Sequence, residues 1–190
     1  MLSNYKVILG SNSPRRREIL KLLNIPFTVA TIGGLDESYP KELEATKVSE
    51  YISNKKADAF VKTMRGNELI ITADTIVICE GKIMGKPKNS EDAIEMLKFL
   101  SGKTHVVTTG VTICTRNKRE SFSTESYVTF ADLTEDEIRY YVETYHPLDK
   151  AGAYGIQEWI GAVAVAKIDG SFYNVMGLPV HRLYQALKHF

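Results

Sequence analysis

The chain has 190 residues, of which 44% are hydrophobic and 25% charged, as expected for a globular protein with one sizeable domain. Its 24 basic and 23 acidic side chains give a formal net charge of +1, which argues against a general nucleic-acid binder. No apolar run approaches the ~20 residues that cross a bilayer, and the N-terminal stretch does not resemble a signal peptide. Cys79 and Cys114 lie in strand-like apolar contexts, which predicts buried thiols and a cytoplasmic location.

The N-terminal segment predicts a strand and then a helix that begins at a basic turn. Residues 5–10 form a short apolar run, and Ser13-Pro14 is a strong helix start with serine at the N-cap. Arg15, Arg16 and Arg17 follow in the first turn, where cations oppose the helix dipole and repel each other. A solvated basic turn is the alternative, but a bound anion explains this conflict better, so we favour an anion site.

This helix continues to about residue 23, and a second strand follows at residues 26–32. The apolar face of the helix consists of four residues: Ile19, Leu20, Leu22 and Leu23. After a break at two glycines, Asp36 and Glu37 place two adjacent acids in a loop. They are either metal ligands or ordinary loop residues, and the pattern alone does not distinguish the two.

Residues 42–64 predict a long helix whose buried stripe carries a lysine. The stripe repeats at helical spacing and contains Val48, Ile52, Ala59 and Phe60. Lys56 falls on the same stripe, four residues after Ile52 and four before Phe60. Its ammonium group either snorkels to the surface, which is the commoner outcome, or reaches into a pocket.

Residues 69–87 combine a buried strand with one acid and one lysine. Asp74 stands between two aliphatic runs, so its carboxylate must lie at a strand end, face a cleft or meet a cation. Residues 80–84 predict a tight turn and a short return strand, and Lys86 follows in a stiff loop. This pair suits a metal-bound or phosphate-bearing ligand, although a turn acid and a solvated lysine explain the pattern equally well.

The second half of the chain mixes helices with hairpins. A helix is predicted from residue 89 to a cap at Gly102, followed by a hairpin of residues 105–115 and 120–130. A helix is predicted after the capping box at 134–137, and two paired strands at 162–168 and 171–175. The inner face of the last predicted helix carries Val180, Leu183 and Leu187. We therefore expect an α/β or α+β fold on a mixed sheet.

A glycine-rich segment at residues 149–157 would let a ligand approach the backbone closely. Asp149 and Lys150 add one charge of each sign, and Gln157 adds an amide that can read a base edge. The alternative is a flexible connector with a surface ion pair. Histidine zinc spacing, GxSxG, the P-loop and GxGxxG are all absent from the sequence. The remaining pattern fits a polyphosphate held by side chains and Mg²⁺: Arg15, Arg16, Lys56, Asp74 and Lys86.

Six motifs in the right order closely resemble the Maf family of nucleotide pyrophosphatases, first named as septum-formation inhibitors. They are SNSPRRREIL at 11–20, ADT at 73–75, GKIMGKP at 81–87, LSGKTH at 100–105, DKAGAYGIQ at 149–157 and NVMGLP at 174–179. The resemblance implies one domain over residues 1–190 with an α/β fold similar to that of the inosine triphosphatases. In that fold a mixed, twisted sheet with flanking helices forms two lobes around a cleft.

The resemblance also implies an activity and its residues. It implies hydrolysis of a nucleoside triphosphate to the monophosphate and pyrophosphate with Mg²⁺ or Mn²⁺, often in a homodimer, with no nucleic-acid or membrane partner. By the matching positions, Asp74 is the proton acceptor, and Glu37 is an acid that assists the metal. Glu37 and Asp74 are the candidate metal ligands. Substrate choice falls to Arg15, Thr75 and Gln157, and phosphate binding to Arg15, Arg16, Lys56 and Lys86. The residues that set substrate choice resemble the dTTP/UTP branch. Glu158-Trp159 departs from the pattern, since many members have glycine there.

Two other functions stay open at this point. A non-catalytic nucleotide-binding regulator of septum formation would use the same cations without needing a base. An inosine-type triphosphatase would prefer purine substrates such as ITP and XTP. A panel of nucleotides assayed for pyrophosphate separates these alternatives.

Overall fold

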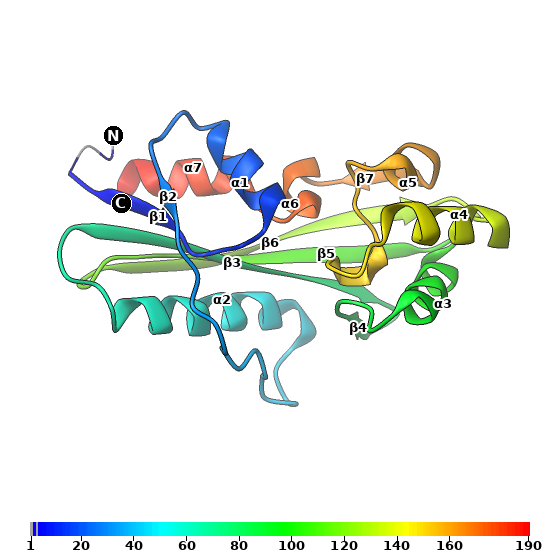
Figure 1. Ribbon diagram of the computed structural model, residues 1–190, viewed down its shortest axis with the longest axis horizontal. Coiled ribbons are helices and arrows are strands. Elements are labelled where there is room, and N and C mark those ends of the chain that lie inside the picture. Colours follow the sequence, from blue (N-terminus) through cyan, green and yellow to red (C-terminus); the bar gives the residue numbers. More distant parts are fainter. Residues whose placement is uncertain (1, 3) are drawn as a thin grey trace. The chain divides into compact units, whose positions relative to one another are not determined.

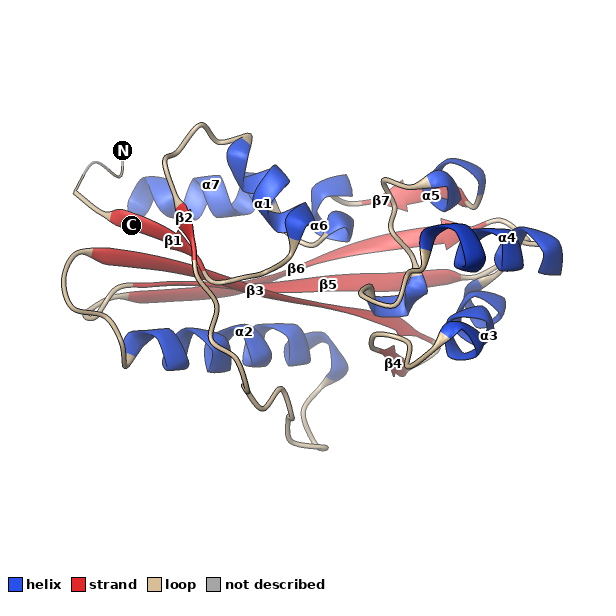
Figure 2. Cartoon of the chain, viewed as in Figure 1, coloured by secondary structure: helices blue, strands red, loops and turns tan. Residues whose placement is uncertain are grey.

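The computed structural model describes residue 2 and residues 4–190 (Figures 1 and 2). The strands are β1 Lys6–Leu9, β2 Thr28–Val29, β3 Glu68–Cys79, β4 Lys82–Met84, β5 Thr104–Cys114, β6 Arg119–Phe130 and β7 Val165–Asp169. The helices are α1 Pro14–Lys21, α2 Ala45–Val61, α3 Ser90–Leu100, α4 Glu135–Tyr145, α5 Trp159–Val163, α6 Phe172–Met176 and α7 Val180–His189, with a 3₁₀ turn η1 at Ala151–Ala153.

The strands among these residues form one mixed sheet. Its order is β2-β1-β3-β5-β6-β7, and β4 pairs with β3 outside that path. Strand β1 runs parallel to both β2 and β3, whereas β3 with β4 and β6 with β7 are antiparallel pairs. The prediction of an α/β fold on a mixed sheet with flanking helices is therefore confirmed.

The chain divides into two compact units. Unit 1 comprises Met1–Asp74, Thr109–Thr124 and Gly177–Phe190, and unit 2 comprises Thr75–Thr108 and Glu125–Met176. Strands β3, β5 and β6 each supply residues to both units. This division agrees with the two predicted lobes. The cleft, and a single domain over residues 1–190, stay predictions.

Unit 1 places α2 on one face of its strands and places α1 and α7 on the other (Figure 1). Helix α2 packs through Ala57 and Phe60 onto Ile70 and Cys114 of the strands. Gly110 of β5 allows the closest approach, because a Cβ atom there would lie 2.2 Å from the backbone nitrogen of Glu50 in α2. The helix backbone thus lies directly against β5.

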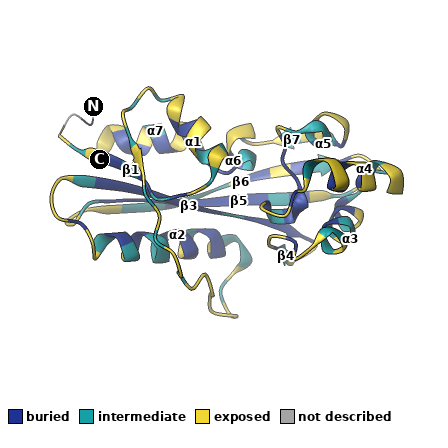
Figure 3. Cartoon of the chain, viewed as in Figure 1, coloured by how far each residue is buried: buried dark blue, intermediate teal, exposed yellow. Residues whose placement is uncertain are grey.

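The apolar core of unit 2 lies between its strands and the neighbouring helices α3 and α4. Leu97 of α3, Tyr141 of α4 and Phe130 of β6 are almost completely buried there. Figure 3 shows the burial of each residue, with mostly buried central strands and with helices that carry both buried and exposed residues. Cys79 belongs to this core and Cys114 to that of unit 1, and both are free, buried thiols as predicted.

Local sequence signals set several element boundaries. The Ser13 side chain caps α1 with Pro14 in its first turn, and Thr134 and Glu137 form the capping box of α4. The β3–β4 hairpin forms at the predicted turn, where Glu80 and Gly81 both have positive φ. The long hairpin of β5 and β6 and the final helix are also confirmed.

Three predictions near chain turns are wrong. Leu22 lies past the end of α1 and is exposed rather than part of its buried face. The predicted strand at residues 26–32 shortens to Thr28–Val29, which pair only with β1. The predicted strand at 162–168 begins only at Val165, because the residues before it form the short helix α5.

The predicted strand at residues 171–175 is helix α6 instead. Strand β7 pairs with β6, not with the segment that follows it. The Ser171 Oγ accepts from the backbone N–H of Asn174, which starts the helical turn. The buried Asn174 amide donates to the Val107 carbonyl at 3.1 Å and to Ser126 Oγ at 3.0 Å. The helix therefore holds a buried amide whose nitrogen donates to two partners on the neighbouring strands.

Candidate active site

The first part of the site lies where α2 packs on β3 in unit 1. Thr72 Oγ1 donates to the Ser53 carbonyl of α2 at 2.8 Å, and Ser53 Oγ lies 2.8 Å from Thr112 Oγ1 of β5. Asp74 follows Thr72 by two residues on β3, so its side chain lies on the same face of the strand. Lys56 follows Ser53 by about one turn on α2, so its side chain lies on the same face of the helix. Asp74 and Lys56 therefore meet at that level.

Lys56 joins two of the predicted acids. Its ammonium lies 2.7 Å from Asp74 Oδ1 and 3.0 Å from Glu37 Oε1. The side chains of Lys56 and Asp74 are 15% and 12% exposed, whereas that of Glu37 is 53% exposed. Lys56 thus reaches inward rather than snorkelling, and the carboxylate within β3 meets a cation, one of the three environments predicted for it.

Arg16 lies close to the same carboxylates. Its Nε donates to the Gly177 carbonyl at 2.8 Å and its Nη1 to Ser11 Oγ at 3.4 Å. Burial lowers the pKa of Arg16, while the negative charges of Asp74 and Glu37 oppose that shift. Arg15 and Arg16, with Arg17 the arginines of the predicted anion site, lie in the first turn of α1, and the charge of Arg15 adds to the lowering of the Arg16 pKa. Unit 1 therefore holds five predicted residues, of which Arg16, Lys56, Glu37 and Asp74 interact electrostatically.

The adjacent acids of the loop before α2 have different surroundings. Asp36 accepts hydrogen bonds from Ser38 and from Lys55, which lower the pKa of its carboxyl to about 2, with the Ser38 hydroxyl as the largest cause. Glu37 instead meets Lys56. Of these two loop acids, Glu37 is the one that shares a cation with Asp74, and its role beside a metal stays a prediction.

The other three predicted residues belong to unit 2. Thr75 is half-buried on β3 directly after Asp74, and Lys86 is exposed in the loop after β4. Gln157 is exposed before α5, and its side-chain nitrogen would lie 3.0 Å from a Cβ atom placed on Gly155. Their roles stay predictions.

Sequence reasoning missed a buried polar network in unit 2. Lys150, for which the sequence leaves a surface ion pair as one of two open alternatives, has only 8% of its side chain exposed. Its ammonium lies 2.8 Å from Asp149 Oδ1 and 3.1 Å from Glu158 Oε1, and Glu158 also accepts a very short hydrogen bond from Tyr141. Nothing in local spacing indicates these contacts, because Tyr141 is 17 residues from Glu158.

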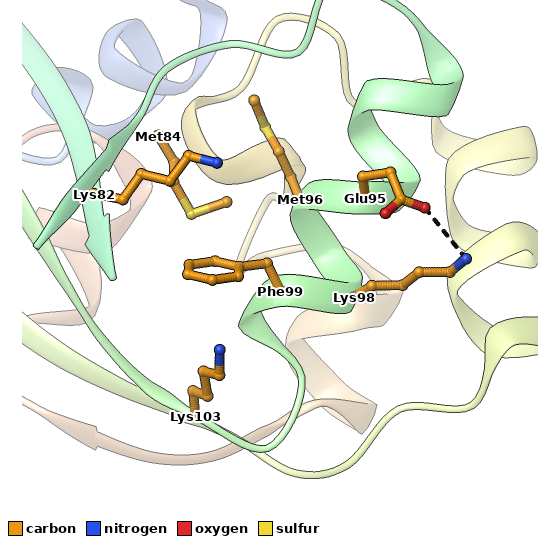
Figure 4. A pocket seen from close by; sticks show the side chains of 7 residues that line it. All are labelled: Lys82, Met84, Glu95, Met96, Lys98, Phe99 and Lys103. Carbon is orange, nitrogen blue, oxygen red and sulfur yellow. Dashed lines mark ion pairs between the residues drawn. The ribbon is translucent and has the colours of Figure 1, made fainter. Parts of the chain in front are cut away.

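A separate hollow of about 430 Å³ lies in unit 2 beside α3 (Figure 4). Its lining residues are Lys82, Met84, Glu95, Met96, Lys98, Phe99 and Lys103. Lys98 pairs with Glu95 at 3.3 Å, and Lys103 pairs with Glu80 at 3.0 Å and lies over the Phe99 ring. The lining contains none of the predicted site residues, and two of its three cations are already paired.

The acids of unit 1 fit a hard divalent cation. Asp74 and Glu37 both place a carboxylate oxygen within 3.0 Å of the same Lys56 nitrogen, so the two oxygens converge on a small region. Oxygen ligands of this kind suit Mg²⁺, which usually takes one or two carboxylates and completes its shell with water and phosphate oxygens. Within the described residues, no group of three or more His, Cys, Asp or Glu side chains forms a metal site.

Comparison with known sequences decides the family. Residues 6–190 match the family described as Maf-like protein. The chain belongs to the Maf-like family. A dTTP/UTP pyrophosphatase of Bacteroides thetaiotaomicron is 54% identical to this Maf-like chain, over 98% of this chain and 97% of the relative. Proteins with the same name from Phocaeicola vulgatus and Flavobacterium johnsoniae are 55% and 45% identical, each over 98% of this chain and over 97% and 95% of the relative.

Among solved structures, the Maf-like chain is similar to a HAM1 protein from Coxiella burnetii, with a TM-score of 0.49 and 12% identity over 98% of this chain and 100% of that one. A dITP/XTP pyrophosphatase from Mycobacterium abscessus gives a TM-score of 0.43 and 12% identity over 67% of this chain and 75% of that chain. Among the described residues, the helices of the Maf-like chain lack the length and apolar character that crossing a bilayer requires.

Proposed function

We propose that this protein hydrolyses dTTP and UTP to the monophosphate and pyrophosphate. The observation that carries the proposal is the pairing of Asp74 with Lys56 beside Arg16, which joins a base to phosphate-binding cations in one unit. The family and the names of its relatives support the same reaction.

The location in the cytoplasm and the homodimer are further proposals. Two free, buried thiols support the first, and light scattering tests the second.

Asp74 is the group that activates water. Its carboxylate accepts a proton from a water molecule that attacks the α-phosphorus, the bond from that phosphorus to the bridging oxygen breaks, and pyrophosphate leaves. Lys56 lies 2.7 Å from the carboxylate and orients it before the reaction. A general base positioned in this way contributes roughly 10²–10⁴-fold to the rate.

The cations hold the triphosphate and stabilise the charge that builds on the leaving group. Arg15 and Arg16 lie in the first turn of α1, and the N-terminal end of a helix favours an anion. Lys56 and Lys86 add two ammonium groups. Glu37 and Asp74 are the residues that would hold Mg²⁺ or Mn²⁺, which when bound neutralises phosphate charge and lowers the pKa of bound water.

Thr75 and Gln157 recognise the pyrimidine base in this proposal. A hydroxyl and an amide can hydrogen-bond the carbonyl and N–H edge that thymine and uracil share. A site that forms such hydrogen bonds rejects a base that leaves them unpaired more strongly than a site that selects by size alone.

The test is a substrate panel. The purified chain is incubated with dTTP, UTP, CTP, GTP, ITP and XTP in the presence of Mg²⁺, and released pyrophosphate is measured. We expect dTTP and UTP to be hydrolysed fastest. Preference for ITP and XTP would indicate the inosine-type activity instead, and tight binding without pyrophosphate release would indicate a regulator.

A further inference from the structure

Glu158 has an unusual place at the start of a helix. It is the N-cap residue of α5, yet its side chain makes no capping hydrogen bond. The carboxylate turns inward instead, accepting from the Tyr141 hydroxyl through one oxygen and lying 3.1 Å from the Lys150 ammonium through the other. With 19% of the side chain exposed, this carboxylate gives up most of its contact with water for these two partners.

Tyr141 connects that carboxylate to the backbone of the preceding loop. Its ring is fully buried in the core of unit 2, and its hydroxyl oxygen accepts from the Gly155 N–H at 3.0 Å. Burial raises the pKa of Tyr141, and the hydrogen bond to Glu158 adds to the shift, so the phenol stays protonated as a donor. Tyr141 thus forms hydrogen bonds with Gly155 and Glu158, the first and last residues of the turn at 155–158.

The side chains of Gln157 and Glu158 lie close to Gly155. A Cβ atom on it would lie 2.9 Å from Cδ of Glu158 and 3.0 Å from the amide nitrogen of Gln157. The backbone N–H of Glu158 also donates to the Gly155 carbonyl at 3.0 Å, which closes a tight turn. The place of the exposed Gln157 amide is therefore set by a turn whose two ends are fixed to Tyr141.

From these contacts we propose that Glu158 and Tyr141 are positioning residues that hold the Gln157 amide for recognition of the base. The buried Lys150 ammonium lies 3.1 Å from Glu158, so one cation, one carboxylate and one phenol fix the turn of residues 155–158. The proposal rests on the proposed function, because it assigns to this network the selectivity between pyrimidine and purine nucleotides.

The test uses the full chain and four variants. Tyr141→Phe removes the hydroxyl that holds Gly155, Glu158→Ala removes the carboxylate, and Glu158→Gln keeps an acceptor for Tyr141 without the charge. Tyr140→Phe is the matched control, because Tyr140 is the neighbouring exposed tyrosine of α4 and packs on the edge of Trp159. Each variant is measured for amide exchange at Gly155, for thermal unfolding, and for kcat and KM with UTP and GTP.

We expect Gly155 amide exchange to rise about tenfold in Tyr141→Phe and Glu158→Ala, the effect of losing roughly one hydrogen bond. The ratio of kcat/KM for UTP to that for GTP should fall by roughly tenfold or more, mostly through KM for UTP, since small misplacements of a binding group are costly. Glu158→Gln should recover part of the ratio, and Tyr140→Phe should match the parent.

Repeating Glu158→Ala in a Gln157→Ala background tests the route of the effect. If Glu158 acts through Gln157, its substitution should change the ratio little once Gln157 is absent. Additive losses would overturn the proposal, as would unchanged exchange in the network variants, or faster exchange with an unchanged ratio. Failure of the parent to release pyrophosphate from any nucleotide would overturn the proposed function and the selectivity role together. Gly155 exchange would then still decide whether the network holds the turn.

Discussion

The Lys56 ammonium of α2 lies 2.7 Å from Asp74 Oδ1 of β3, and each side chain is at least 85% buried. The residues that precede the pair, Ser53 on the helix and Thr72 on the strand, are themselves joined by a hydrogen bond of 2.8 Å. The ion pair is therefore the continuation of a regular seam between helix and sheet. A pair held in this way keeps its geometry without a bound ligand.

Removing the carboxylate charge should stop turnover and leave the fold intact. We expect Asp74→Asn to lose at least ~100-fold in kcat for dTTP, which is a typical contribution of a general base. The measurement is pyrophosphate release, with thermal unfolding as the check on folding. Asp58→Asn is the control, because Asp58 lies on α2, the helix that carries Lys56, but pairs with Arg119 at the surface. Full activity of Asp74→Asn would remove Asp74 from the mechanism.

Breaking the ion pair from the other side should destabilise the protein. Lys56→Met leaves Asp74 buried without its cation, which we expect to cost on the order of 1–3 kcal/mol in unfolding free energy. Adding Asp74→Leu should recover part of that loss, since two apolar groups replace the broken ion pair, while the buried Arg16 loses the favourable charge of Asp74. Urea denaturation measures both. A double variant less stable than Lys56→Met would show that the pair is not the source of the effect.

Chelation of divalent ions should abolish hydrolysis. We expect EDTA to stop pyrophosphate release and Mg²⁺ or Mn²⁺ to restore it. Glu37→Gln should raise the Mg²⁺ concentration needed for half-maximal activity by roughly tenfold. Asp36→Asn is the matched control in the next residue, whose carboxylate bonds Ser38 and Lys55 instead. Undiminished activity in EDTA would contradict the requirement for a metal.

The close approach of α2 to β5 should make one glycine irreplaceable. Gly110→Ala places a methyl group 2.2 Å from the Glu50 nitrogen, where backbone must move, so we expect a loss of roughly 3 kcal/mol in stability. Activity should fall as well, because α2 carries Lys56. Gly33→Ala, with no atom within 4 Å of the new methyl, should change little. Denaturation that leaves the two variants equal would refute the expected clash.

His105 should make the fold sensitive to acid. Burial lowers the pKa of His105 to about 4 from an ordinary 6.5, while its Nε2 lies 2.8 Å from the Tyr154 hydroxyl. Between these values the unfolded chain binds a proton that the folded chain does not, so stability falls as pH falls from 6.5 to 4. The loss is about 3 kcal/mol in total.

The substitution His105→Phe removes the titrating group and should flatten this dependence. Unfolding by urea at several pH values between 7.5 and 4 measures the slope, and His181→Gln, which removes an exposed histidine, is the control. A slope that survives His105→Phe would assign the acid sensitivity to other groups.

The sequence predicted most reliably where a local rule decides the structure. The Ser13-Pro14 start, the Thr134 capping box and the Glu80-Gly81 turn each depend on residues within four positions, and all three formed as expected. The anion site inferred from the conflict between three arginines and the helix dipole stays a prediction. The predicted cations and acids of unit 1 do interact.

The errors come from contacts between distant residues. The segment at 171–175 has strand-like side chains, but it forms a helix in which the buried Asn174 amide donates hydrogen bonds to residues of β5 and β6. Lys150 has no local signal of burial in the sequence, because the fold brings it to Glu158, which is itself bound by Tyr141. Such pairings have no signature within a short window of sequence.

The interleaving of the two units has a consequence for the gene. Unit 1 extends from one end of the chain to the other, and residues 109–124 of unit 1 interrupt unit 2. No continuous fragment therefore encodes either unit alone. Recombination between relatives cannot exchange a unit as one cassette, so variation should accumulate by point substitution.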